Sequence, residues 1–346
     1  MDETTLGKPL KSSLKMVAAR AQVSPATVSR ILNGTAKVSG EKRVRIEAAI
    51  AELGFRPNMA ARSLAGGRSM SIGVITQFIS SPFYAEALRG LEDELARHNY
   101  IPLFMSSQWD PAQEETKIRR LIERNVDGIV LLSSQLSGQQ LFEFGNELPI
   151  VVTGRYFESI QASSVNWDNT YSGVLAADHL LELGHRSIAV IVGALGHEDS
   201  HERMVGIQTR LKESGIMLDA NRVRNGDYTE QGGYKAAKAL IASGQQFTGL
   251  IALNDQMAIG ANLALREAGI HVPSQVSLVG CDDIQFAEFV DPPLTTVHQP
   301  IYELGEHAAK HVLSLVNKVR LPRESIALPH MVVRGSTAPC QVNVPS

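Results

Sequence analysis

The chain has 346 residues, a formal net charge of −3 at pH 7 and a hydrophobic content of 44%. This length is enough for more than one domain, and two cysteines are too few for a disulfide framework or a cysteine-based metal site. Because neither a secretory segment nor an apolar stretch of 18 residues occurs, we expect no membrane span. Residues 1–12 are expected to be a disordered leader.

A helix-turn-helix pattern occupies residues 14–33. Residues 14–21 predict a first helix, and Gln22 and Val23 form a tight connection. Ser24 is a good N-cap, and Pro25 suits the first position of a second helix, where its missing N–H costs nothing. The apolar positions recur at i, i+3 and i+4 and predict one buried face; they are Val28, Ile31 and Leu32. The polar side chains left outside, able to reach phosphates and base edges, are Thr27, Ser29, Arg30 and Asn33. This spacing is typical of a motif that enters the major groove of DNA.

A third helix should complete this small unit, since two short helices cannot bury a core alone. Ser39 is its expected N-cap, Glu41 lies in its first turn, and Gly54 ends it. Its expected apolar stripe consists of Val44, Ile46, Ile50 and Leu53. We therefore predict an all-α headpiece over residues 13–57. Residues 58–65 are helix-prone but too short to be stable alone in water, so we expect a hinge at residues 58–68 that is ordered only by a partner.

The charge is unevenly distributed along the chain. Residues 1–68 carry 12 Lys/Arg and 5 Asp/Glu, which leaves 21 basic and 31 acidic side chains for the remainder. A polyanion would be attracted to the headpiece alone, and its affinity would fall as salt rises.

Beyond the hinge, apolar runs alternate with amphipathic stretches. The runs that predict strands are residues 71–75, 101–105, 128–132, 150–152, 188–192, 249–253 and 276–279. The stretches that predict helices are residues 83–98, 114–124, 176–183, 201–214, 231–243 and 256–268. This alternation predicts an α/β core of two doubly wound parallel sheets, each covered by helices on both faces.

Polar side chains follow several of these strands, and ligands of such sheets bind at the carboxyl ends of the strands. One wall of a cleft would be formed by Arg203, Tyr228, Asn254 and Asp282, and Phe83 and Tyr84 would face them. Carboxylate, amide and guanidinium groups beside aromatic rings suit a small polyhydroxylated ligand. Arg155 either adds a second cation and favours a sugar acid, or lies on the surface.

Residues 197–201 match the zinc-peptidase pattern H-E-x-x-H. Zinc would need both imidazoles on one helical face and a third ligand, but a loop precedes this segment and the apolar flanks of a buried metal helix are missing. We therefore expect no metal and assign the segment to the mouth of the cleft. The phosphate-binding, nucleophile-elbow and dinucleotide fingerprints are absent, so we expect neither an enzyme nor a cofactor.

Two stretches, residues 23–33 and 56–64, resemble the LacI/GalR family of transcriptional regulators, and the resemblance continues through the C-terminal half. It implies a periplasmic-binding-protein-like core at residues 69–346. The N-subdomain would hold about residues 69–168 and 299–328, and the C-subdomain about 169–298 and 329–346. In the family, the residues matching Arg203, Asn254 and Asp282 bind the effector, and the aromatic matching Tyr228 packs on it. This chain departs from the family at Cys281, where an aromatic is usual.

The resemblance also implies how DNA is bound. Two headpieces of a homodimer would read a palindromic, double-stranded operator. Pro25 and Ala26 would touch thymine methyl groups, and Arg30 would contact a base or a phosphate. Leu64 would wedge into the minor groove. The full set of expected DNA-binding residues is Ser24, Pro25, Ala26, Thr27, Ser29, Arg30, Asn33, Asn58, Ala61, Arg62 and Leu64.

The resulting expectation is a bacterial, cytoplasmic repressor of carbohydrate-use genes that a small sugar or sugar acid releases from its operator. Two alternatives stay open: the same scaffold with a corepressor or as an activator, and a solute-binding module or enzyme without specific DNA binding. Because no long heptad tail follows Leu321, a dimer is favoured over a tetramer.

Overall fold

The structure, a computed structural model, describes residues 12–32, 39–55, 68–155, 162–193, 197–319 and 326–341. The chain divides into two compact units, Met1–Ser69 and Met70–Ser346. Most of the predicted leader, Asn33, and residues 58–67 of the predicted hinge lie outside the described residues.

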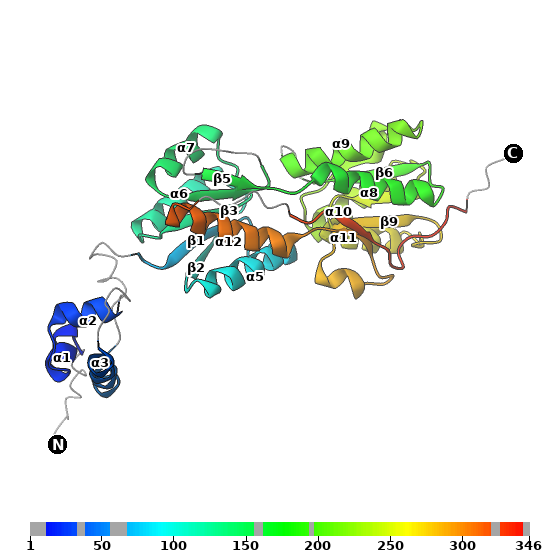
Figure 1. Ribbon diagram of the computed structural model, residues 1–346. Helices are drawn as coiled ribbons and strands as arrows, with labels where there is room; N and C mark the ends of the chain where they lie inside the picture. The colour runs from blue at the N-terminus through cyan, green and yellow to red at the C-terminus, as the bar shows by residue number, and fades with distance from the viewer. Residues whose placement is uncertain are drawn as a thin grey trace, which may run out of the picture. The chain divides into compact units, whose positions relative to one another are not determined.

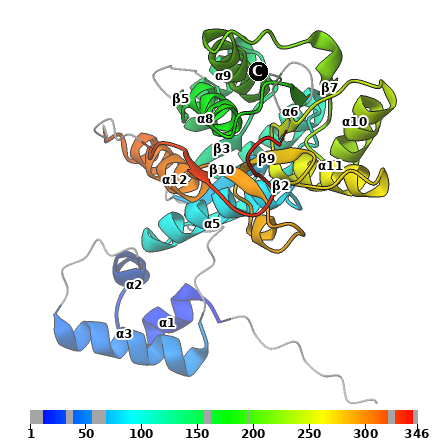
Figure 2. The same cartoon turned by 90° about the vertical axis from the view of Figure 1, so that its right-hand side faces the viewer.

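The first unit is the three-helix headpiece (Figure 2), formed by α1 (Leu14–Arg20), α2 (Pro25–Leu32) and α3 (Gly40–Leu53). Val28 is fully buried, and Ile31 and Leu32 pack against the same core, which confirms the predicted face of α2. The Ser24 hydroxyl accepts a hydrogen bond from the backbone N–H of Thr27 at 3.2 Å, as expected of an N-cap.

Two details of α3 differ from expectation. Ser39 precedes the helix, but its side chain makes no capping hydrogen bond. Val44 is 64% exposed, so its assignment to the apolar stripe was wrong. The reason is geometric: Ile46, Ile50 and Leu53 follow helical spacing, whereas a residue two positions before Ile46 lies on the opposite face. Gly54 ends the helix at φ +55°, as predicted.

The second unit contains two lobes, each built on one sheet (Figure 1). In the first lobe five parallel strands lie in the order β2-β1-β3-β4-β5. They are β1 (Ser71–Thr76), β2 (Ile101–Ser106), β3 (Gly128–Leu132), β4 (Ile150–Thr153) and β5 (Ala162–Val165). Its helices are α5 (Pro82–Arg97), α6 (Pro111–Glu123), α7 (Gly138–Glu147) and α12 (Ile301–Asn317). Successive strand residues alternate between two buried clusters, one shared with α5 and α12 and the other with α6 and α7.

The sheet of the second lobe has six strands in the order β11-β10-β9-β8-β6-β7. They are β6 (Ile188–Val192), β7 (Val223–Asn225), β8 (Gly249–Ala252), β9 (Ser277–Asp282), β10 (Thr295–His298) and β11 (His330–Val332). Its α-helices are α8 (Asn169–Glu182), α9 (Glu198–Glu213), α10 (Glu230–Ala242) and α11 (Asp255–Glu267), with short 3-10 turns at Ala220–Arg222 and Gln285–Glu288. Contrary to the expectation of a wholly parallel sheet, β11 runs antiparallel to β10, because it closes the edge after the chain has returned from the other lobe.

The chain crosses between the lobes three times: from β5 to α8, from β10 to α12 and from α12 to β11. As Figure 1 shows, α12 therefore packs beside α5 although the two helices are far apart in the sequence. The strands and helices expected from the sequence end at β9, so β10, α12 and β11 were not predicted as elements. Three further elements, α7, β5 and β7, were not predicted either.

Three helix pairs pack with their backbones in close contact: α5 with α12, α8 with α9, and α10 with α11. Each contact uses one glycine from each helix; the pairs are Gly90 with Gly305, Gly173 with Gly206, and Gly233 with Gly260. A Cβ at Gly173 would lie 2.0 Å from the backbone oxygen of Arg203, so only glycine fits there. This contact fixes the position of the Arg203 backbone on α9.

Candidate functional site

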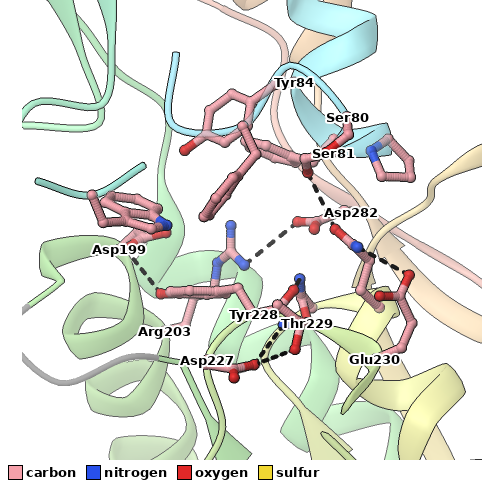
Figure 3. A pocket seen from close by; sticks show the side chains of 16 residues that line it. Ser80, Ser81, Tyr84, Asp199, Arg203, Asp227, Tyr228, Thr229, Glu230 and Asp282 are labelled. Carbon is pink, nitrogen blue, oxygen red and sulfur yellow. Dashed lines mark hydrogen bonds and ion pairs between the residues drawn. The ribbon is translucent and has the colours of Figure 1, made fainter. Parts of the chain in front are cut away.

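A cavity of about 350 Å³ lies at the carboxyl ends of the strands and is lined by residues of both lobes (Figure 3). The first lobe contributes Phe78, Ser80, Ser81, Pro82, Phe83, Tyr84 and Trp109. The second contributes Asp199, Arg203, Asp227, Tyr228, Thr229, Glu230, Asn254, Gln256 and Asp282. Six of the seven predicted effector residues are thus brought together, and Arg155 is the exception.

The aromatic wall comes from the start of α5 and from the loop after β2. Phe83 and Tyr84 pack edge to face, with ring centroids 5.1 Å apart. Burial raises the pKa of Tyr84, so its hydroxyl stays protonated at neutral pH. Trp109 follows the end of β2 by three residues and is half-buried. These rings give the first lobe an apolar surface with a few hydroxyl groups.

The polar wall is organised around Arg203, which is almost fully buried on α9. Its guanidinium donates to the Asn169 side-chain oxygen at 3.0 Å and to the Leu253 carbonyl. The same group lies 3.5 Å from Oδ1 of Asp282, the last residue of β9 (Figure 3). The cation is thereby held in one orientation beside a buried carboxylate.

Asp282 brings a buried carboxyl group to the wall of the cavity. Its side chain is almost fully buried, yet Oδ1 has no hydrogen-bond donor among the described residues. Burial raises the pKa of this carboxyl, and the nearby Arg203 cation opposes that effect. A buried acceptor without a donor is costly, so a ligand hydroxyl or amine that donates to Oδ1 would relieve this cost.

Asn254 positions its neighbours rather than presenting free groups. Its side-chain oxygen caps α11 by accepting from the Met257 N–H at 2.9 Å, and its Nδ2 donates to the Tyr228 carbonyl at 3.0 Å. Tyr228 has a positive φ of +64°, and its hydroxyl donates to Asp199 Oδ1 at 3.1 Å. The amide therefore helps to hold the Tyr228 ring against the cavity.

The two lobes touch each other across the cleft. The Ser81 hydroxyl donates to Gln256 Oε1 at 3.2 Å. The ring of Trp109 packs edge-on against His197, with centroids 4.0 Å apart, and lies 6.4 Å from the Tyr228 ring. Because these contacts join residues of different lobes, opening of the cleft would break them.

Several lining residues were not among the predicted effector contacts, chiefly Trp109, Asp199, Asp227, Glu230 and Gln256. The strand-end criterion was sufficient to find Trp109, which follows β2. Asp199 stands in the segment assigned to the mouth of the cleft, and Asp227 immediately precedes the predicted Tyr228.

The structure places Arg155 away from the cavity. Its guanidinium donates to the Leu136 carbonyl at 2.6 Å and lies near the buried carboxylate of Glu114. That carboxylate accepts from the Ser134 hydroxyl and the Gln135 N–H. Arg155 therefore serves the loop after β3, and the second cation expected in the cleft is not there.

The H-E-x-x-H segment begins α9. His197 precedes the first turn and packs on Trp109, while Asp199 lines the cavity, so this segment lies at the cleft. Over the ranges that the structure describes, no group of three or more His, Cys, Asp or Glu side chains is arranged to hold a metal ion. Cys281 is buried beside Gln299, which donates to its Sγ at 3.0 Å.

Asp255, next to Asn254, points into the second lobe and allows a test by pH. It accepts hydrogen bonds from the Thr296 hydroxyl and the Ile284 N–H. Burial raises the pKa of its carboxyl from an ordinary 3.8 to about 6. Between these values the folded state holds a proton that the unfolded state has lost, so this group's stabilising contribution is complete below pH 3.8 and falls as pH rises to 6. We expect a loss of at most about 3 kcal/mol in the free energy of unfolding over that range.

The matched variant is Asp255→Asn, whose amide can accept from Ile284 and donate to Thr296, since a hydroxyl can reverse its role. Urea unfolding at several pH values should show a smaller decline for this variant than for the wild type. Parallel pH profiles for the two proteins would contradict the assignment.

In the headpiece, Ser24, Pro25, Ala26 and Arg30 are exposed, and Thr27 and Ser29 are half-buried. The Ser24 and Thr27 hydroxyls bond to each other at 2.9 Å. The remaining predicted DNA contacts, Asn33, Asn58, Ala61, Arg62 and Leu64, lie outside the described residues. In the part of the chain that the structure describes, no helix is both long and apolar enough to cross a membrane.

Two family models match the chain. One, described as bacterial regulatory proteins of the lacI family, matches residues 13–58, and the other, described as a periplasmic binding protein-like domain, matches residues 177–337. The HTH-type transcriptional repressor CytR of Escherichia coli (strain K12) is 34% identical over 328 residues, covering 94% of this chain and 96% of its own. The ribose operon repressor of Haemophilus influenzae is 30% identical over 314 residues, with coverages of 91% and 94%.

Solved structures give the same relationship. A lac repressor dimer bound to operator and the anti-inducer ONPF matches with a TM-score of 0.84 and 28% identity, covering 96% of this chain and 100% of its own. A complex of the transcriptional regulator CelR with cellobiose matches with a TM-score of 0.71 and 31% identity, with coverages of 94% and 99%.

Proposed function

Because this chain belongs to the lacI family of bacterial regulatory proteins, we propose that it is a DNA-binding repressor that a small hydroxylated effector releases from a palindromic operator. The observation that carries this proposal is the pairing of two sites in one chain. A helix-turn-helix presents the exposed residues of α2, and a separate cleft ends on the unsatisfied Asp282 oxygen. One site suits the DNA groove and the other a small molecule.

We propose that the working form is a homodimer, as in the lac repressor structure bound to operator. Phe286 and Phe289, in and just after the 3-10 turn that follows β9, are 58% and 72% exposed. Large exposed aromatic side chains of this kind fit an interface with a second copy. Because a DNA-binding regulator acts on the chromosome, we place the protein in the bacterial cytoplasm. We assign it a binding role and no catalytic role.

The effector would act by changing how the lobes contact each other. Ligand bound between Asp282 and the aromatic wall favours one arrangement of the Ser81–Gln256 and Trp109–His197 contacts. The predicted hinge at residues 58–68 would respond to that arrangement, since a marginal helix shifts with a few kcal/mol of differential ligand affinity.

The proposal is tested by gel shift on genomic fragments at physiological salt, with sugars added one at a time. A specific complex that an effector weakens supports a repressor with an inducer. A complex that an effector strengthens replaces the inducer with a corepressor, while the absence of any specific complex refutes the DNA-binding role.

Arg30→Ala tests the groove-facing surface of α2. The side chain is exposed, and its Nε donates to the Ala26 carbonyl one turn earlier. If Arg30 contacts a base, we expect the free energy of operator binding to weaken by about 1–3 kcal/mol. If it contacts a phosphate, the plot of log affinity against log salt concentration should become less steep by about one unit of slope. Fluorescence anisotropy with labelled operator measures both quantities.

Arg45→Ala is the control, because Arg45 is an exposed cation of the same headpiece that lies on α3. Equal losses in the two variants would show that only the overall charge of the headpiece matters.

A further inference from the structure

The lining of the cleft is strongly unbalanced in charge. Four carboxylates border the cavity: Asp199, Asp227, Glu230 and Asp282. Of the described residues that line it, Arg203 alone carries a positive charge.

The single cation is already committed to protein groups. Arg203 lies 3.5 Å from Asp282 and donates to Asn169 and to the Leu253 carbonyl. An ionised Asp282 carboxyl balances the Arg203 charge, and a protonated one leaves it to the other three carboxylates. In either state the carboxylates that line the cavity outnumber the one guanidinium.

The other three carboxylates have neutral partners. Asp199 accepts from the Tyr228 hydroxyl, Asp227 from Thr229, and Glu230 from the Gln256 amide (Figure 3). None of these contacts offsets the negative charge. An anionic ligand in the cavity would face net repulsion, which is strong at short range in a site of reduced dielectric.

The aromatic rings of both lobes act in the same direction as the carboxylates. Trp109, Tyr228, Phe83 and Phe78 present rings to the cavity, and ring faces attract cations and stack on the apolar faces of neutral sugars. The arginine that would have favoured a sugar acid, Arg155, is bonded to Leu136 instead.

We propose that this cleft accepts an uncharged or positively charged polyol and excludes sugar acids and sugar phosphates, with Asp227 and Glu230 setting this selectivity at the entrance. The inference rests on the proposed function, since it assumes that the effector binds here. Asp282 would accept a hydrogen bond from a ligand hydroxyl or amine, and the exposed carboxylates of Asp227 and Glu230 would repel anions before they enter.

The potential in the cleft can be measured without knowing the effector. The chain has two tryptophans, so Trp167→Phe leaves Trp109 as the only indole, at the cavity wall. Its fluorescence is quenched separately with caesium, iodide and neutral acrylamide, with N-acetyltryptophanamide as the free reference. We expect the ratio of the caesium quenching constant to the iodide quenching constant to be several-fold higher for Trp109 than for that reference.

In a variant that also carries Asp227→Asn and Glu230→Gln, the ratio of the two quenching constants should be close to that of the free indole. Glu213→Gln is the control, because this exposed carboxylate at the end of α9 does not line the cavity. Iodide quenching as efficient as caesium quenching in the parent protein would overturn the proposal.

Ligand selectivity is tested directly by thermal shift and calorimetry with matched sets. The first set is glucose, glucosamine, glucuronate and glucose 6-phosphate. The second set is ribose and ribose 5-phosphate. In any set that binds, the neutral or amino sugar should bind at least tenfold more tightly than the sugar acid or the sugar phosphate. The variant that carries both Asp227→Asn and Glu230→Gln should show a smaller difference in affinity. Tighter binding of an acid or a phosphate overturns the proposal, and if no set binds, the quenching ratio decides it.

Operator binding separates this inference from the proposed function. If a neutral sugar binds in the cleft but does not alter the operator complex, the charge selectivity stands and the regulatory role fails. If an acid releases the operator, the regulatory role stands and the charge selectivity fails.

Discussion

Val28→Asp is expected to abolish specific operator binding, with a loss of affinity of at least a hundredfold, while the effector-binding unit stays folded. Val28 is fully buried between the helices of the headpiece. An unpaired carboxylate there would be far costlier than the few kcal/mol that a core of three short helices supplies. Fluorescence anisotropy with labelled operator measures the affinity, and circular dichroism of the purified variant shows whether the rest of the chain stays folded.

Val44→Asp is the matched control, since it makes the same chemical change on α3 at a side chain that is 64% exposed. It should fold normally and keep operator affinity to within a few-fold, as exposed substitutions usually cost little. Wild-type operator binding by Val28→Asp would mean that the headpiece is not the DNA-binding element.

Arg203→Ala is expected to lower the free energy of unfolding of the core by about 3–5 kcal/mol and to eliminate effector binding. The substitution leaves the buried Asp282 carboxylate without its cation and removes the donor to Asn169 and Leu253. Urea unfolding reports the first effect and calorimetry with a hit from the ligand panel reports the second. Operator binding should persist without any response to that ligand.

Arg210→Ala provides the control two turns further along α9. Arg210 is an ion-paired arginine as well, but its side chain is about one-third exposed and its partner is Asp178. A partly exposed pair contributes about 1 kcal/mol or less. Comparable losses in the free energy of unfolding of the two variants would contradict the special role assigned to the buried Arg203.

The long apolar strands were predictable because burial on both faces requires continuous hydrophobic runs. Residues 128–132 and 188–192 are β3 and β6 as predicted. The edge strands β7 and β11 have only three residues each, too few for any period to be recognised. α12 shows a clear helical period in Ile301, Leu304, Ala308 and Val312. This period does not say which lobe the helix joins; the family resemblance, which implied residues 299–328 for the N-subdomain, carried that expectation.

The candidate site was predictable wherever position along a strand decides the outcome. Arg203, Asn254 and Asp282 stand at or near strand ends, and the topology brings those ends together. The sequence does not reveal how a long side chain turns. Arg155 follows β4 as expected, yet it reaches the Leu136 carbonyl rather than the cavity. Nor does it show that the amide of Asn254 is occupied by backbone groups.

The insertion of α12 between β10 and β11 has a consequence for synthesis on the ribosome. The first lobe cannot complete its core until residue 317 has emerged, because α12 covers one face of its sheet. Until then the apolar surface formed by Val130, Val151 and Leu91 lacks its cover, a condition that favours aggregation of nascent chains. Translation that stops before α12 is therefore expected to yield an insoluble fragment, and chaperones that bind nascent chains should be engaged for almost the whole length of the message.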